Sequence, residues 1–320
     1  MDSARSGVIA MVAACVIWGL SPLYYKLLSH VPPLEVLAHR TLWSLVTFAI
    51  FLGMQGRLRM LGAALGTARA AGLTTAAAVA ISCNWFLFIM SVQTGRTTEA
   101  SLGYYIFPLV AVLLGVLAFG ERLAKLQWAA VALAAAAVVV MTLGEGVTPL
   151  ISLMIAFTFG IYGLVKKGLS VGPVVSVTAE VTVLAPLAMG WLVWTHLEGG
   201  GAYAADPATT ALLMVSGPLT AVPLVLFSRA AVRVRYATVG LIQYLNPTLQ
   251  FFCAVIIFAE PFTTVHAAVF GLIWAALALY SASAFASDRA RRRRPITSVA
   301  EPPERTKSSS DASAKPARTT

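Results

Sequence analysis

Three ionisable side chains lie inside apolar stretches of this 320-residue sequence, where a charge is costly unless it is paired or hydrated. His39 and Arg40 adjoin in LEVLAHRTLWS, and Glu180 lies in SVTAEVTVL. His39 could take up and release a proton near neutral pH, or it packs as a hydrogen-bonded side chain. Glu180 suits a proton-coupling carboxyl group or a structural partner of an arginine or tyrosine. Arg40 either faces a cavity or anchors its helix at the membrane surface. We take all three as candidates for coupling or charge relay.

A second set of side chains offers hydrogen-bond donors and aromatic faces within similar stretches. Such groups usually point toward the interior of a helix bundle. Each alone is more often a contact between helices than a ligand contact, and tryptophans near helix ends are commonly surface anchors. We expect a substrate cavity lined by Trp18, Asn84, Trp85, Tyr104, Tyr105, Gln243, Tyr244 and Asn246.

The sequence has no motif of a soluble enzyme. It lacks a phosphate-binding P-loop, an HExxH zinc motif, a paired CxxC and a GxSxG nucleophile motif. Its three cysteines, Cys15, Cys83 and Cys253, lie in apolar runs and predict no disulfide framework. We therefore predict no catalytic residues, no metal site, no cofactor and no ATP hydrolysis by this chain.

The composition is that of a membrane protein, and it defines the elements that must position these residues. The chain is 58% hydrophobic and 11% charged, with a mean hydropathy of +0.81, whereas soluble domains carry about 25% charged residues. An apolar run of about 20 residues can cross the hydrocarbon core as a helix. The expected helices are 7–29, 34–53, 70–92, 99–119, 126–143, 147–165, 174–195, 209–228, 237–258 and 264–286.

An internal repeat relates the two halves of the chain. Pro108 and Glu121 in the first half match Pro247 and Glu260 in the second at one offset of 139 positions (247 − 108 and 260 − 121). Arg96, Leu102 and Tyr105 find matching residues at the same offset, and Gly19 and Lys26 match Gly160 and Lys167 at an offset of 141 (160 − 19). The prolines are predicted to kink their helices, and the glutamates to act as gates or caps.

Positive charge fixes the expected orientation. All but three of the 23 lysines and arginines, namely Lys26, Arg40 and Arg96, fall in the two termini and in alternate loops. Such residues remain on the cytoplasmic side, so both termini are predicted to be cytoplasmic. The ten expected helices divide into two repeats of five helices each. Because five is odd, the second repeat must enter the membrane inverted relative to the first.

The composition changes abruptly after Ser287. The segment 288–320 has almost no large apolar residues and is predicted to be disordered. Its Arg291–Arg294 run adjoins the last helix, so we expect contact with anionic lipid head groups rather than with nucleic acid. The predicted organisation is a five-helix repeat in 1–145, a second, inverted repeat in 146–287, and a basic cytoplasmic tail.

Several strings closely resemble one family. The chain is similar over residues 7–286 to the RarD group of EamA-type transporters, in the drug/metabolite transporter (DMT) superfamily. That resemblance implies a multi-pass permease of the bacterial inner membrane that exports small organic molecules. The strings include IWGLSPLYYKLL (17–28), VLAHRTLWS (36–44), NWFLFI (84–89), EASLGYYIFPL (99–109) and FGIYGLVKK (159–167).

The sequence thus predicts an all-α membrane transporter of ten helices, with a cavity between two inverted halves that opens alternately to each side. Its expected partners are the lipid bilayer, a small and partly apolar or amino-acid-like substrate, and protons bound at Glu180 or His39. An uncoupled facilitator, a membrane-embedded enzyme using His39, Arg40 and Glu180, and a scaffold or sensor are the alternatives. Homo-oligomerisation is left open.

Overall fold

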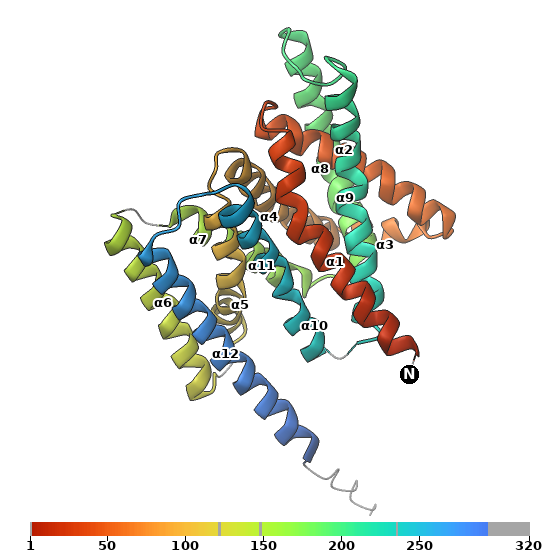
Figure 1. Cartoon of the computed structure of the whole chain (residues 1–320). Helices are drawn as coiled ribbons and strands as arrows, with labels where there is room; N and C mark the ends of the chain where they lie inside the picture. Colours follow the sequence, from red (N-terminus) through yellow and green to blue (C-terminus); the bar gives the residue numbers. More distant parts are fainter. Residues whose placement is uncertain (1, 121–122, 147–148, 235, 294–320) are drawn as a thin grey trace, which may run out of the picture.

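The computed structural model describes residues 2–120, 123–146, 149–234 and 236–293, and this part of the chain is helical without strands (Figure 1). The first half contains α1 (Asp2–Leu27), α2 (Pro33–Met54), the 3₁₀ turn η1 (Leu58–Met60), α3 (Leu61–Leu65), α4 (Ala68–Gln93), α5 (Thr97–Phe119) and α6 (Lys125–Glu145). The second contains α7 (Leu150–Lys166), α8 (Pro173–Leu197), α9 (Pro207–Ala231), α10 (Tyr236–Gln243), α11 (Leu245–Phe252), the π-helical turn η2 (Cys253–Ile257) and α12 (Thr264–Arg293).

Each predicted apolar stretch coincides with helical segments over most of its described residues. Within the described ranges, nine helical stretches are long and apolar enough to cross a membrane, with α10, α11 and η2 together contributing the one at Thr238–Ile257. The tenth predicted stretch corresponds to α7, which is apolar but only 17 residues long. Leu117, Leu143 and Leu187 are each more than 70% exposed on the outside of the bundle, as expected where lipid replaces water.

Local sequence explains where several helices begin and end. The carboxylate of Asp206 accepts hydrogen bonds from the backbone N–H groups of Ala208 and Thr209, so it caps the start of α9. Gly120 ends α5 in the left-handed conformation, at a φ of 64°. α10 and α11 are separated at Tyr244, three residues before Pro247, because a proline ring displaces the carbonyl group four positions earlier. α5, in contrast, continues through Pro108.

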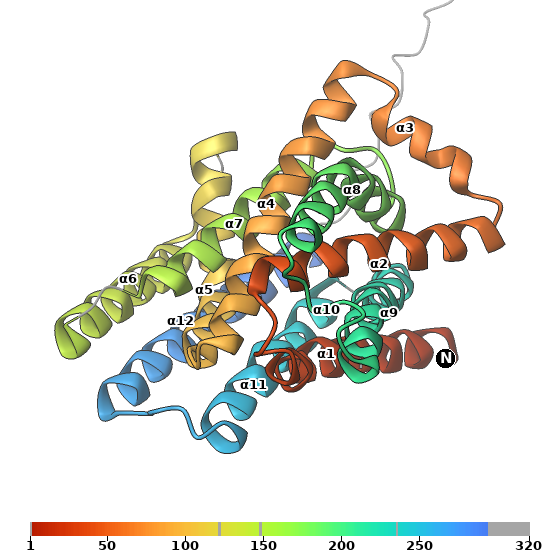
Figure 2. The same cartoon turned by 90° about the horizontal axis from the view of Figure 1, so that it is seen from above.

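The helices pack in pairs that connect the two halves of the chain. α1 lies against α9 and α11, and α7 lies against α4 and α5. α2 contacts α8 and α9, α4 also contacts α8, and α6 runs along α12 at one side of the bundle (Figures 1 and 2). In Figure 1 the start of α1 and the end of α12 lie at the same, lower side of the bundle.

Candidate functional site

Arg40 is a buried cation near the centre of the bundle. Its side chain comes from α2 and the residue is 6% exposed. Its Nε donates a hydrogen bond of 3.0 Å to Thr220 Oγ1 on α9, and its guanidinium lies 4.0 Å from the ring centre of Trp85 on α4. The ring of Tyr25 is 5.8 Å away. Arg40 is therefore held by a hydroxyl group and two aromatic faces from three neighbouring helices.

A chain of aromatic rings leads from Arg40 into the second half of the molecule. We call Tyr25, Phe88, Tyr104, Phe159 and Tyr162 the aromatic chain. Successive ring centres are 5.8, 5.8, 5.8 and 5.9 Å apart, within the range of favourable edge-to-face and offset contacts. The first three rings belong to α1, α4 and α5, whereas the last two belong to α7. The chain therefore crosses the boundary between the predicted repeats.

Asn84 fixes the middle of the aromatic chain. Its Oδ1 accepts a 2.8 Å hydrogen bond from the Tyr104 hydroxyl group. Its Nδ2 donates to the Ile155 carbonyl oxygen at 2.9 Å and to Thr158 Oγ1 at 3.1 Å, both on α7. The amide thus joins α4, α5 and α7 through its hydrogen bonds, while its predicted place in a substrate cavity stays a prediction.

An ion pair with a buried carboxylate lies at the far end of the aromatic chain. Lys166 Nζ on α7 is 2.5 Å from Glu180 Oε1 on α8, and Ser176 Oγ donates to the same oxygen at 2.9 Å. The Tyr162 hydroxyl group donates to Glu180 Oε2 at 3.2 Å. The Glu180 side chain is fully buried, while the Lys166 side chain is 20% exposed. The carboxylate therefore has a cation, a hydroxyl group and a phenol as partners.

His39 points away from the Arg40 contacts. Its ring stacks on Tyr203, with centres 4.9 Å apart, and lines a cavity of about 530 Å³ between α2, α8 and the segment that links α8 to α9. His196 and Trp43 line the same cavity. His39 Nε2 is buried and has no hydrogen-bond partner. His39 and Arg40 are neighbours in sequence, but their side chains have separate surroundings.

The remaining predicted cavity residues lie outside the contacts of Arg40 and the aromatic chain. Trp18 packs on Phe227, with ring centres 6.1 Å apart. Tyr105 bonds Thr248 Oγ1 at 2.6 Å and packs with Tyr244 into the apolar core between α5, α6 and α12. Asn246 accepts a hydrogen bond from Gln250 on its own helix, and Gln243 ends α10.

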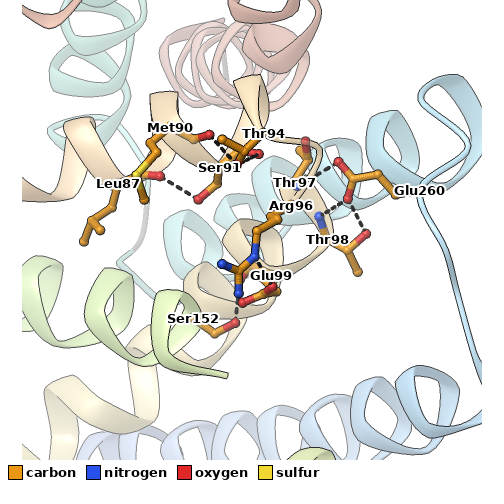
Figure 3. A network of polar contacts seen from close by, with 10 residues as sticks. All are labelled: Leu87, Met90, Ser91, Thr94, Arg96, Thr97, Thr98, Glu99, Ser152 and Glu260. Atoms are coloured by element: carbon orange, nitrogen blue, oxygen red, sulfur yellow. Dashed lines mark hydrogen bonds and ion pairs between the residues drawn. The ribbon is translucent and has the colours of Figure 1, made fainter. Parts of the chain in front are cut away.

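Glu260, which follows η2, contacts the start of α5 in the other half of the chain (Figure 3). Its Oε1 accepts a 2.8 Å hydrogen bond from the Thr97 N–H group, and its Oε2 accepts from the N–H and hydroxyl groups of Thr98 at 2.7 and 2.8 Å. These N–H groups are the unpaired donors at the start of α5, so Glu260 acts as a cap on a helix distant in sequence. Its predicted counterpart, Glu121, lies outside the described residues. The Arg291–Arg294 run extends beyond them.

Sequence reasoning missed several members of the site. The charge pattern places Lys166 in a cytoplasmic loop, and no sequence pattern singles out Thr220, Phe88 or Phe159. One signal was present: Tyr162 and Lys166 are four positions apart in FGIYGLVKK, which places them on the same face of a helix. Both reach Glu180 from that face.

Comparisons with known proteins agree with this architecture. Residues 5–143 match the model of the EamA-like transporter family. The chain is 42% identical over 291 residues to "Protein RarD" of Streptomyces exfoliatus, covering 91% of this chain and 92% of the relative. It is 40% identical to "Uncharacterized transporter YojE" of Bacillus subtilis, covering 87% of this chain and 94% of that relative.

A further relative and a solved structure extend the match. "Protein RarD" of Escherichia coli is 36% identical, over 89% of this chain and 97% of its own length. A structure titled "Crystal structure of protein" aligns at a TM-score of 0.56 and 17% identity, over 86% of this chain and 97% of that one, which shows the shared fold alone. The chain is thus a multi-pass membrane protein, and it belongs to the RarD group of EamA-like transporters in the DMT superfamily.

Proposed function

We propose that the chain is a secondary-active transporter of the bacterial inner membrane that exports small, partly apolar organic molecules. One observation carries the proposal: Arg40 and Glu180 are buried within the bundle, Glu180 is paired with the partly exposed Lys166, and an aromatic chain that crosses between the halves connects the two sites. Buried charges in a membrane protein are costly and mark solute or ion pathways. Aromatic rings supply the apolar surface for an organic solute.

Two inverted halves would give this site alternating access. Exchanging α1 with α7, α2 with α8, α4 with α9, α5 with α11 and α6 with α12 converts the large helix contacts into one another. The α1–α9 contact becomes the α7–α4 contact, and the α1–α11 contact becomes the α7–α5 contact. The α2–α8 and α6–α12 contacts are converted into themselves. This is the pattern expected of two repeats related by a two-fold axis in the membrane plane.

Two glycines support the same relation at atomic scale. A Cβ atom at Gly19 would lie 2.6 Å from Leu249, and one at Gly160 would lie 2.8 Å from Leu114 and 3.3 Å from Val110. Gly19 and Gly160 are matched in the repeat, and Val110 and Leu249 are 139 positions apart (249 − 110), the offset of the proline-containing helices. Each glycine thus packs closely against the proline-containing helix of the other half, α11 for Gly19 and α5 for Gly160. We therefore assign residues 1–145 and 146–287 to the two repeats. The distribution of lysines and arginines supports a cytoplasmic location for both termini.

Proton coupling would use Glu180. Protonation of its carboxyl group would remove the charge that holds Lys166, and a change in this pair could bias α7 against α8. The engagement of Glu180 by three partners favours the second candidate function, an uncoupled facilitator in which the pair is structural. His39 has no contact with this pair, so its role in coupling would require a separate route.

Transport by sealed proteoliposomes tests the proposal. Aromatic carboxylates, amino acids and amphenicol drugs are offered with and without an imposed pH gradient, and empty liposomes serve as the control. Accumulation driven by the gradient, lost in Glu180→Gln, supports a coupled transporter. Full gradient dependence in Glu180→Gln excludes Glu180 as the coupling group. Equilibration without accumulation supports the facilitator, whereas chemical conversion of a solute would indicate an enzyme.

A further inference from the structure

Arg40 lacks the anion that a buried guanidinium normally requires. Within the described ranges, the ion pairs join Arg96 to Glu99, Lys166 to Glu180 and His266 to Glu145, and none includes Arg40. Its hydrogen bond to Thr220 goes to a neutral oxygen. Moving a charge out of water without an opposite charge beside it carries a large desolvation cost. Charged residues therefore persist inside membrane helices mainly where they have a function.

The orientation of the guanidinium leaves its hydrogen-bonding edge available. Thr220 takes the Nε proton, and Trp85 covers a face of the group. The two terminal nitrogens have no hydrogen bond to the described residues, and they are not among the buried polar atoms sealed without a partner. Each terminal nitrogen therefore keeps some accessible surface, although the residue as a whole is only 6% exposed. Together the two nitrogens form a donor pair that can bind two oxygens of one carboxylate.

The surroundings of Arg40 also select the kind of anion. Tyr25, Phe88 and Tyr104 lead away from the guanidinium as a row of aromatic rings. Tyr25 and Phe88 are buried in the core, while Tyr104 and Trp85 are only half-buried, so the surroundings of the guanidinium are aromatic and apolar. An organic acid could place its carboxylate at Arg40 and its apolar body against the half-buried rings. Arginine suits this task better than lysine, since its planar fork matches a carboxylate and also stacks on an aromatic face.

We propose that Arg40 is the anchor for the carboxylate group of the transported solute, which is an organic acid with an apolar or aromatic body. This inference rests on the proposed transport function and adds the substrate class. Thr220 is a positioning residue, because it holds the Nε edge and leaves the terminal nitrogens directed toward the ligand. Trp85 lies against a face of the guanidinium and so helps to fix the orientation of its plane.

Binding can be measured without transport. The purified protein in detergent is titrated with pairs of probes that differ only at the acid: phenylacetate with phenylacetamide, 3-phenylpropionate with its amide, and indole-3-acetate with its amide. Ligand-induced thermal stabilisation is the readout. We expect at least one acid to bind about tenfold or more tightly than its amide, because a charge-assisted pair is lost with the amide.

Variants of the site make the test specific. Arg40→Gln should remove the difference between acid and amide, Arg40→Lys should restore only part of it, and Thr220→Val should weaken acid binding several-fold with little effect on the amide. Arg96→Gln is the matched control, because Arg96 is paired with Glu99 and its side chain is 45% exposed. It should bind both probes like the wild type. If Arg40→Gln does not fold, the Arg40→Lys and Thr220→Val results decide.

Three outcomes would overturn the inference: no acid of the panel binds, acid and amide bind equally, or Arg40→Gln and Arg40→Lys bind the acid like the wild type. Acid-selective binding by a protein that moves no solute in liposomes would refute transport and leave the anion site intact. Transport of neutral solutes only, independent of Arg40, would leave transport intact and refute the anion site.

Discussion

At the scale of single residues, Arg40 and Glu180 occupy equivalent places and are satisfied in different ways. Each lies seven positions after the first residue of its helix (40 − 33 and 180 − 173), which is roughly 10 Å along the axis. Glu180 has a protein cation beside it, whereas Arg40 has only neutral partners. The second half therefore carries a self-contained ion pair, and the first half retains an unpaired cation.

Removing one member of the ion pair should cost more than removing both. Lys166→Met leaves the Glu180 carboxylate buried with neutral partners only, so we expect a loss of about 3 kcal/mol in the free energy of unfolding. The double variant Lys166→Met with Glu180→Met should recover most of this, because no charge remains buried. The thermal midpoint of the purified protein is the measurement. Equal loss in the single and double variants would show that the pair contributes no specific coupling.

The sequence alone identifies these candidate residues but does not identify their partners. A charge inside an apolar run is visible without any structure, so Arg40, His39 and Glu180 were identifiable. Their partners were not, because Lys166 and Thr220 come from other helices whose rotation the sequence leaves undetermined. The same rotation places His39 beside Tyr203 and Arg40 beside Trp85, although the two residues are neighbours in the chain.

At the scale of the elements, Glu260 shows how one half stabilises a helix of the other. Its carboxylate accepts three hydrogen bonds at the start of α5 (Figure 3). Glu260→Gln keeps one acceptor oxygen and turns an amide N–H₂ toward a backbone N–H group. We expect a loss of about 1–2 kcal/mol, typical of a lost helix cap, and faster hydrogen exchange in the first turn of α5.

Glu145→Gln is the control for this prediction. Glu145 also links two segments by accepting a hydrogen bond from Thr263, but its side chain is 29% exposed and it caps no helix start. We expect the control to change the thermal midpoint less than Glu260→Gln does. Equal effects of the two variants would mean that capping of α5 is not the contribution of Glu260.

A close helix contact gives a sharper prediction for α9. A Cβ atom at Gly217 would lie 2.3 Å from the Trp43 carbonyl oxygen and 2.4 Å from its carbonyl carbon. These are backbone atoms of α2, so Gly217→Ala must separate the two helices, at a cost of about 1–3 kcal/mol. Gly190→Ala, with nothing within 4 Å, should be neutral or slightly stabilising. Thermal unfolding of both variants tests this, and equal midpoints would contradict the tight α2–α9 packing.

Hydropathy located the long helices because each is apolar over the length needed to cross the bilayer. Hydropathy does not predict the short helical segments or the π-helical turn. The short η1 and α3 segments lie outside the apolar runs, and the π-helical turn η2 depends on packing rather than on composition. Pro247 was a usable signal for the interruption between α10 and α11, whereas Pro108 lies in a helix without an interruption.

At the scale of the whole molecule, α7 decides whether the inverted arrangement holds. Its 17 residues extend for about 25 Å, somewhat less than the ~30 Å hydrocarbon core. A short helix can still span if the bilayer thins locally or flanking residues reach the surface. Lys166 and Lys167 at its end could reach the surface in this way. If α7 spans, five helices separate the α2–α3 connection from the α8–α9 connection, and the two lie on opposite faces of the membrane.

Cysteine labelling in intact cells tests this parity. In a Cys83→Ser background, which removes the exposed native cysteine, single variants Arg57→Cys and Glu198→Cys are treated with a membrane-impermeant maleimide. Both positions are exposed, and the other native cysteines, Cys15 and Cys253, are buried. We expect Glu198→Cys to react in intact cells and Arg57→Cys to react only after permeabilisation, because basic loops remain cytoplasmic. The reverse pattern would place the termini outside the cytoplasm. Identical behaviour of the two variants would mean that four helices cross between them, so that α7 does not span and the two halves are not inverted copies.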